Sequence, residues 1–204
     1  MSQPPDPAVG AARRTAPVLN VANGLTALRL VLVPVFFALT VASGLVQPTL
    51  RMSATVVFVV ASLTDFIDGW IARTWDLVTS FGKVADPIAD KALTGTALLL
   101  LSWYRHLPWW VTVVVLVREL GVTLLRFGVI RRGVIPASRG GKIKTALQIL
   151  AISWYLWPFP ARLSGVGAAV MAVAVVFTVL TGADYVIRAI RLRRPAGRVA
   201  DGGG

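Results

Sequence analysis

The chain has 204 residues, of which 56% are hydrophobic and only 15% are charged, whereas soluble domains carry about 25% charged residues. The mean hydropathy of +0.72 and the repeated apolar runs exclude a soluble globular protein and predict one helical membrane domain. Cys is absent and His occurs once, which excludes disulfide scaffolds, Cys nucleophiles and metal sites built from thiolates or imidazoles. Any chemistry must therefore use carboxylates, hydroxyls or cations.

The apolar runs divide the chain into a membrane domain with a polar segment at each end. Residues 1–17 are rich in Pro, Ala and polar groups and predict a disordered cytosolic tail. Residues 18–191 form the predicted membrane domain, and residues 192–204 a basic cytosolic tail that ends in glycine. The expected fold class is an all-α integral membrane protein with six transmembrane helices, at roughly 19–45, 52–71, 88–104, 108–130, 143–160 and 164–190.

The positive charge predicts how these helices are oriented. The net charge is +12, and 15 of the 21 Lys and Arg residues fall on one side of the predicted membrane, against three on the other. Lys and Arg in short loops favour the cytoplasm, so both termini are predicted to be cytoplasmic, in a protein of the plasma membrane. The three remaining cations, Arg29, Arg118 and Arg126, lie inside spans and require a polar cavity, a partner or the interface.

Acidic residues are scarce, and five of the nine lie between positions 65 and 90. Asp65 and Asp68 close the second predicted span at i, i+3 spacing. Asp86 and Asp90 open the third at i, i+4 spacing, so each pair lies on one helix face. Four carboxylates gathered beside a bilayer repel one another and favour a divalent cation. With oxygen ligands alone, the pattern predicts Mg²⁺, or Mn²⁺, in a centre of two ions.

A simpler interpretation applies to Asp86. It precedes Pro87, and Asp followed by Pro is typical of a helix N-cap and the first helical position. This interpretation leaves Asp65, Asp68 and Asp90 unexplained at the ends of apolar spans.

Residues 65–90 have the pattern D-x2-D-G-x2-A-R-x8-G-x3-D-x3-D, which resembles the signature of the CDP-alcohol phosphotransferase family. The resemblance implies an enzyme that transfers a phosphatidyl or similar group from a CDP-linked donor to an alcohol. It implies two divalent metal ions on the four Asp residues, with Asp90 also acting as the general base. Gly69, Arg73 and Thr79 are then expected to contact the CDP moiety.

Two further segments resemble the branch of this family that makes phosphatidylglycerol phosphate. They are residues 20–29, with Ala22 where that branch usually has Pro, and residues 118–148, which end at Gln148. The resemblance implies CDP-diacylglycerol as donor, glycerol 3-phosphate as acceptor and CMP as the second product. Asn23 and Thr26 are expected at the CDP site. The expected contacts of the acceptor phosphate are Arg118, Arg139, Lys142 and Lys144.

The cations around the fourth and fifth spans also have a simpler reading. Those of residues 131–139 fit positive-inside charges or contacts to anionic lipid headgroups equally well. Arg118 and Glu119 differ, because both lie inside an apolar run. Adjacent residues on a helix point about 100° apart, so no ion pair between these two is expected.

Three other functions and one association remain open from the sequence. The same chemistry could use inositol phosphate as acceptor, or phosphatidylglycerol, as in cardiolipin synthesis. A non-catalytic ion transporter could hold a cation with the same carboxylates. Nucleic-acid binding is not expected, because the positive charge follows the predicted topology. The small residues that begin the last span suggest close helix packing and a homodimer: Gly165, Gly167, Ala168 and Ala169.

Overall fold

The computed structural model describes residues 21–74, 80–129 and 139–193. This part of the chain is all-helical, without a strand. Its elements are α1 (Val21–Ser43), α2 (Pro48–Thr74), α3 (Ser80–Trp103), α4 (Trp109–Val129), α5 (Arg139–Leu156), the short 3-10 helix η2 (Ala161–Leu163) and α6 (Ser164–Arg193). Each of the six apolar runs of the sequence lies in one α-helix, which confirms the all-helical fold class.

The third helix begins earlier than the sequence predicts. It starts at Ser80 and not near residue 88, so Asp86 and Pro87 lie inside α3. The reading of Asp86 as a helix N-cap is therefore wrong. Pro87 lacks the N–H that would bond to the carbonyl four residues earlier, but the neighbouring hydrogen bonds carry the helix through it. This extra length places Asp86 and Asp90 on one continuous helix.

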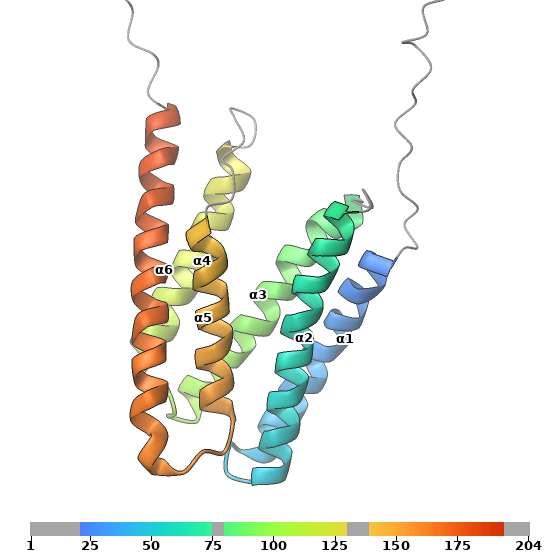
Figure 1. The fold of residues 1–204 in the computed structure, drawn as a ribbon, viewed down its shortest axis with the longest axis vertical. Coiled ribbons are helices and arrows are strands. Elements are labelled where there is room, and N and C mark those ends of the chain that lie inside the picture. Colours follow the sequence, from blue (N-terminus) through green and yellow to red (C-terminus); the bar gives the residue numbers. More distant parts are fainter. Residues whose placement is uncertain (1–20, 75–79, 130–138, 194–204) are drawn as a thin grey trace, which may run out of the picture.

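Three helices have the length and apolar composition needed to cross a membrane, and they indicate a membrane protein. They are residues 23–43 of α1, residues 48–69 of α2 and residues 161–188, which include α6. The other three α-helices carry charged residues within the helix. Figure 1 shows that the first turn of α1 and the last turn of α6 lie at the same end of the bundle.

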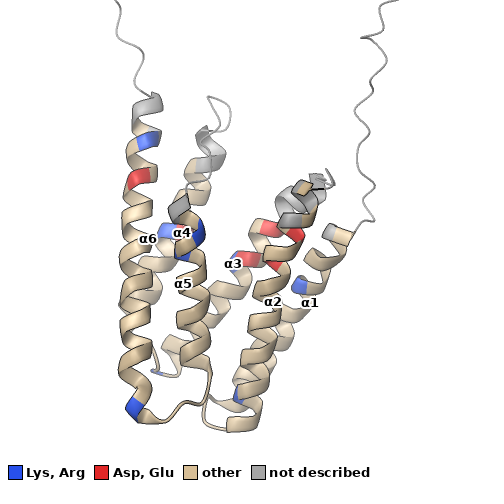
Figure 2. Cartoon of the chain, viewed as in Figure 1, with Lys and Arg blue, Asp and Glu red and all other residues tan. Residues whose placement is uncertain are grey.

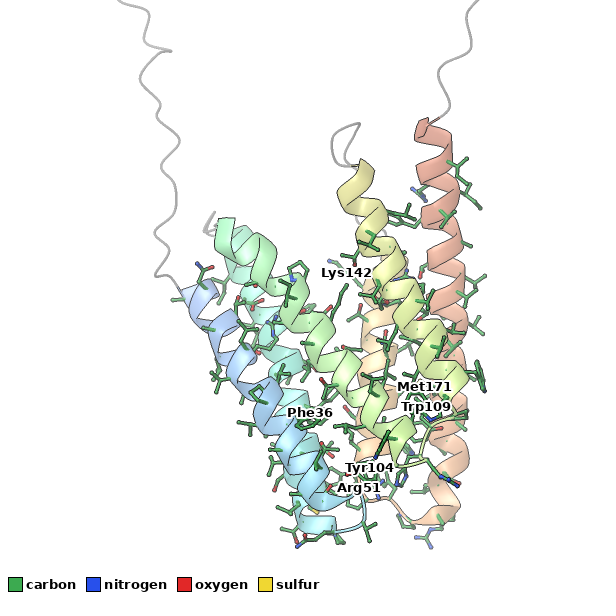
Figure 3. The ribbon with its side chains drawn as sticks, turned by 180° about the vertical axis from the view of Figure 1, so that it is seen from behind. Phe36, Arg51, Tyr104, Trp109, Lys142 and Met171 are labelled. Atoms are coloured by element: carbon green, nitrogen blue, oxygen red, sulfur yellow. The ribbon has the colours of Figure 1, made fainter. Side chains whose placement is uncertain are left out.

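Two helix pairs, α1 with α2 and α5 with α6, form the body of the bundle, and α4 packs mainly against α6. The two pairs touch through α2 and α5, and α3 touches α1, α2, α4 and α5. The buried core runs through all six helices and includes Phe36, Phe58 and Met171. Phe36 and Phe58 join α1 to α2 with ring centroids 5.5 Å apart. Figure 3 shows Phe36 and Met171 on the two flanks of the bundle.

Arg51 connects the two pairs at one end of the bundle. Its Nε and Nη2 donate hydrogen bonds to the carbonyls of Leu156 and Tyr155, at 2.7 and 2.8 Å, and its Nη1 to the carbonyl of Leu45 at 3.1 Å. The last carbonyls of a helix have no partner within that helix, so Arg51 caps α5 from α2. Figure 3 shows Arg51 at the end of the bundle remote from Lys142.

Candidate active site

A fully buried cation lies between the two acids of α2. Arg29 of α1 is 0% exposed, and its Nη1 donates to Asp65 Oδ1 at 2.6 Å while its Nη2 donates to Asp68 Oδ2 at 2.5 Å. Its Nε lies 3.3 Å from the carbonyl of Ala61. A buried guanidinium requires an opposite charge nearby and acceptors for its N–H groups, and the i, i+3 spacing of Asp65 and Asp68 supplies two carboxylates on one face.

The same helix also reaches the acids of α3. Thr26 lies one turn before Arg29 on α1, and its hydroxyl donates to Asp86 Oδ1 at 2.6 Å. Asp65 lies within electrostatic range of Asp68, Asp86 and Asp90. The two acidic pairs of the sequence therefore lie next to each other at one end of the bundle. We call these four residues the acidic cluster, and Figure 2 shows acids on α2 and α3 at that end.

The acidic cluster has the donor chemistry of a hard divalent cation, since its ligands are all carboxylate oxygens. Within the described residues, however, no three acids surround one point closely enough to hold a metal ion. Arg29 gives the physical reason, because its guanidinium draws Asp65 and Asp68 toward α1. The residues fit a divalent metal ion, provided that these side chains turn from Arg29 toward it.

A cavity of about 230 Å³ adjoins the acidic cluster between α3, α4 and α5. Asp90 lines it, so this residue belongs to both the cluster and the cavity wall. The wall also carries both signs of charge and several uncharged polar groups. Its polar residues are Asp90, Lys91, Thr94, Glu119, Lys144, Thr145 and Gln148, and its other residues are Gly95, Leu99, Leu116, Leu120 and Ile149.

Glu119 is the centre of the charges in this cavity. Lys144 of α5 donates a short hydrogen bond to Glu119 Oε1. Lys91 of α3 has its Nζ 3.8 Å from Glu119 Oε2 and 3.9 Å from Asp90 Oδ2. One carboxylate thus holds cations from two other helices, and the cations keep their positions beside Asp90.

Arg118 points away from the cavity toward α6. Its Nε donates to the carbonyl of Thr178 at 3.0 Å and its Nη2 to Thr181 Oγ1 at 2.7 Å. Its Nη1 also donates to Glu119 Oε1 at 3.0 Å. The expectation that Arg118 and Glu119 form no ion pair is wrong, because the long Arg side chain bends back over the helix. Gly182 makes room for it, since a Cβ there would lie 3.0 Å from Arg118 Cγ.

The other expected site residues differ in how far the structure describes them. Asn23 is buried in α1, and Gly69 directly follows Asp68 in α2. Lys142 is exposed near the start of α5. Thr79 lies outside the described residues, as do the side chains of Arg73 and Arg139.

A larger cavity, of about 730 Å³, lies at the opposite end of the bundle. Its lining is Ser102, Trp103, Arg105, His106, Leu107, Pro108 and Trp109. Burial, with a smaller contribution from the charge of Arg51, lowers the pKa of His106. This cavity has no carboxylate in its wall, and His106 is the one residue there that could act as a base.

Sequence reasoning missed four parts of this site. Arg29 was expected to need a partner, but the spacing within α1 does not name Asp65 and Asp68. Lys91 directly follows Asp90, and Glu119 follows Arg118, so both were adjacent to residues already singled out. Gln148 is four residues after Lys144, which places the two on one face of α5.

The fold and the site together define a helical membrane enzyme with a carboxylate centre beside a polar cavity. The family model for CDP-alcohol phosphatidyltransferases matches residues 19–180, and the chain belongs to this family. Members of the family generally use a divalent metal ion. The match covers α1 to α5 and the first part of α6, so family membership extends over most of the fold as well as the acidic segment.

Comparison with known proteins gives relatives from several bacteria. A probable phosphatidylglycerophosphate synthase of Mycobacterium tuberculosis strain H37Rv is 50% identical over 185 residues, covering 91% of this chain and 88% of its own length. A CDP-diacylglycerol–glycerol-3-phosphate 3-phosphatidyltransferase of Bacillus subtilis strain 168 is 38% identical over 181 residues, covering 82% and 94%. The protein of the same name from Escherichia coli K12 is 33% identical over 172 residues, covering 81% and 92%.

Proposed function

We propose that this chain transfers the phosphatidyl group of CDP-diacylglycerol to glycerol 3-phosphate, giving phosphatidylglycerol phosphate and CMP in phospholipid synthesis. The family and the names of the relatives support the reaction and its substrates. The observation that carries the proposal is the position of Asp90. Its carboxylate belongs to the acidic cluster and lines the cavity that holds Lys144, so one residue faces both the donor side and the acceptor side.

Asp90 is the proposed general base. It accepts the proton of the primary hydroxyl of glycerol 3-phosphate, and the hydroxyl oxygen forms a bond to the phosphorus that carries the diacylglycerol. The bond from that phosphorus to the bridging oxygen of the diphosphate breaks, and CMP leaves with the electron pair. Lys91, whose Nζ is 3.9 Å from Asp90 Oδ2, favours the ionised form of this carboxylate, which is the form that accepts the proton.

The proposed cofactor is Mg²⁺, as two ions held by Asp65, Asp68, Asp86 and Asp90, with Mn²⁺ as a substitute. Such ions neutralise the charge that develops on the diphosphate as CMP leaves. Arg29 and Thr26 hold three of these carboxylates from α1, and they would set the direction from which the remaining oxygens face a metal ion.

The donor and the acceptor use different walls of the site. The CDP moiety is assigned to Gly69, Arg73, Thr79, Asn23 and Thr26, of which Asn23 and Thr26 belong to α1 and Gly69 to α2. The acceptor phosphate is assigned to the cavity side, with Lys144 in the wall and Arg139 and Lys142 on the same helix. Arg118 is bonded to α6, so its role is to hold Glu119, which in turn holds Lys144.

The size of the cavity favours a small acceptor. Its 230 Å³ lies below the range of about 300–1,000 Å³ that is usual for drug-sized ligands. Glycerol 3-phosphate is a small, compact dianion, and the two cations of the wall suit it. Phosphatidylglycerol carries two acyl chains that this polar cavity would not accommodate.

The proposed arrangement in the membrane has six spans within residues 18–191, with cytosolic tails at 1–17 and 192–204. The site then faces the cytoplasm at the plasma membrane, where the CDP part of the donor lies in water and glycerol 3-phosphate arrives from water. A homodimer through the exposed small residues Gly165, Ala168 and Ala169 is part of the proposal. Gly167 is excluded from that surface, because it packs against Trp154 within the chain.

An acceptor panel tests the proposed function. Purified protein is given CDP-diacylglycerol labelled in the phosphatidyl group, with glycerol 3-phosphate, inositol phosphate or phosphatidylglycerol. We expect labelled phosphatidylglycerol phosphate, and equal amounts of CMP, with glycerol 3-phosphate only. Transfer to another acceptor would identify a different branch of the family. Divalent-dependent ion flux without any CMP would identify a transporter.

A further inference from the structure

Gln148 is a buried polar residue with an unused hydrogen-bonding group at the proposed acceptor site. The residue is 4% exposed on α5, and its Nε2 has no hydrogen-bond partner within the described residues. Leaving such a group buried and unpaired costs about 1–3 kcal/mol. Proteins keep such groups where another molecule supplies the partner.

The residue with this unused group lies in the wall of a cavity. Gln148 lines the 230 Å³ cavity together with Asp90 and Lys144. The other buried and unpartnered side-chain atom in the described residues is Ser153 Oγ, which does not line this cavity. Among the described residues, Gln148 is therefore the one that has an unpartnered side-chain nitrogen and also lines the polar cavity beside the proposed general base.

We propose that Gln148 binds the secondary hydroxyl of the acceptor and makes the enzyme selective for a glycerol phosphate. This inference rests on the proposed function, because it takes the cavity between α3, α4 and α5 as the acceptor site. It adds a specificity-determining residue to the groups that hold the phosphate and accept the proton.

The residues of the cavity wall indicate that a hydroxyl of the acceptor, and not its phosphate, binds at Gln148. Lys91 and Lys144 are the cations of the cavity, and a phosphate dianion binds where they lie. Gln148 is neutral, and its amide both donates and accepts, which matches a hydroxyl. It lies one helical turn beyond Lys144, about 6 Å along α5. An acceptor held by its phosphate at Lys144 and its primary hydroxyl at Asp90 still has its middle hydroxyl to pair.

The test compares two acceptors that differ in that hydroxyl alone. Glycerol 3-phosphate has it, and 3-hydroxypropyl phosphate lacks it while keeping the phosphate and the primary hydroxyl. We expect the wild-type enzyme to favour glycerol 3-phosphate by about tenfold in kcat/KM, the worth of one well-placed hydrogen bond. In Gln148→Met, which keeps the length of the side chain, this ratio should fall to near one.

The activity of the variant with each acceptor is also measured separately. The Met variant should lose activity with glycerol 3-phosphate, mainly through KM, and keep its activity with 3-hydroxypropyl phosphate. Gln148→Leu provides the same comparison if the Met variant does not accumulate. Gln47→Met is the matched control, because Gln47 is exposed in the turn before α2 and should leave the ratio unchanged.

Two further readouts separate this role from a structural one. Since Gln148 Nε2 has no partner among the residues that the structure describes, Gln148→Met should not lower the melting temperature without acceptor, whereas the shift induced by glycerol 3-phosphate should shrink. An unchanged ratio in an active variant, or an equal loss with both acceptors, overturns the role of Gln148. Absence of CMP release by the wild-type enzyme with glycerol 3-phosphate instead overturns the proposed function.

Discussion

Arg29 donates a hydrogen bond to Asp68 across the interface of α1 and α2, with 2.5 Å between Nη2 and Oδ2 and with both side chains buried. Asp68 is one of the four residues assigned to metal binding, so a cation of the protein and a divalent cation interact with the same carboxylate. The two cations therefore compete for it. The strength of the ion pair sets how much affinity a metal ion must supply to turn Asp68 away from α1.

The first prediction removes the cation of this pair. Arg29→Met leaves Asp65 and Asp68 without their shared partner, and we expect the free energy of unfolding in EDTA to fall by about 3–5 kcal/mol. Adding Mg²⁺ should raise the melting temperature of the variant more than that of the wild type, since the ion then meets unpaired carboxylates. Thermal unfolding in detergent, with EDTA and with Mg²⁺, measures both effects.

The matched control is Arg188→Met. Arg188 pairs with Asp184 on the exposed surface of α6, and exposed pairs contribute at most about 1 kcal/mol. An equal response of the wild type and the Arg29 variant to Mg²⁺ would contradict the competition between Arg29 and the metal ion.

The second prediction concerns the general base. Asp90→Asn keeps the size of the side chain but cannot accept the proton, so we expect CMP release to fall by about 10²–10⁴-fold. The melting temperature should change little, since the one ion pair of Asp90 among the described side chains is the 3.9 Å contact with Lys91. Asp184→Asn serves as the control and should retain full activity. Turnover at the wild-type rate in Asp90→Asn would exclude this residue as the base.

The third prediction concerns metal removal. Chelation of divalent ions should stop CMP release, and Mg²⁺ should restore it, because the charge that develops on the departing CMP would then again be neutralised. Release of CMP is measured at constant ionic strength so that screening stays the same. Full activity in the presence of excess chelator would rule out the centre of two metal ions.

The fourth prediction tests the role of Glu119 in holding the cations of the cavity. Glu119→Gln leaves Lys144 and Arg118 without their shared carboxylate, and removing one partner of a buried pair costs about 3–5 kcal/mol. Glycerol 3-phosphate is a dianion that can take the place of the carboxylate beside Lys144. Its addition should therefore raise the melting temperature of this variant more than that of the wild type. A smaller shift would mean that Lys144 does not bind the acceptor.

The fifth prediction concerns the space that Gly182 leaves for Arg118. In Gly182→Ala the new Cβ would lie 3.0 Å from Arg118 Cγ and 3.2 Å from its Nε. Arg118 must then shift, and we expect a loss of about 1–3 kcal/mol in stability. Gly165→Ala on the same helix meets nothing within 4 Å and is the control. Equal stability of the two variants would contradict the tight contact at Gly182.

The sequence predicted the helices better than their ends. Runs of apolar residues predict α1 to α6, because a segment inside a membrane must satisfy its own backbone hydrogen bonds and therefore forms a helix. The start of α3 was predicted too late, since residues 80–87 mix polar and apolar side chains and carry a proline, so apolar content does not reveal that the helix continues through them. Helix propensity in such a segment is a weak local signal, and Asp86 lies on that extension.

The partners of the site residues were largely beyond sequence reasoning. The spacing of Asp65 and Asp68 gives their shared face, but which side chain meets that face depends on how α1 packs against α2. The sequence therefore predicted that Arg29 needs a partner, but it did not predict that Asp65 and Asp68 are that partner. The pair of Arg118 and Glu119 was missed for another reason, because the angle between adjacent positions ignores the reach of a long flexible side chain.

The hydrogen bonds of Arg51 to Leu156 and Tyr155 fix α2 to α5 at one end of the bundle, and from there the two helix pairs diverge toward the charged end (Figure 1). These hydrogen bonds lie at one end of the two helix pairs, and the site lies toward the other end. A small rotation about Arg51 would move the loops next to it very little and the ends bearing Asp68 and Lys144 the most. Such a rotation would change the width of the site between α2 and α5 while the two helices stay joined at Arg51.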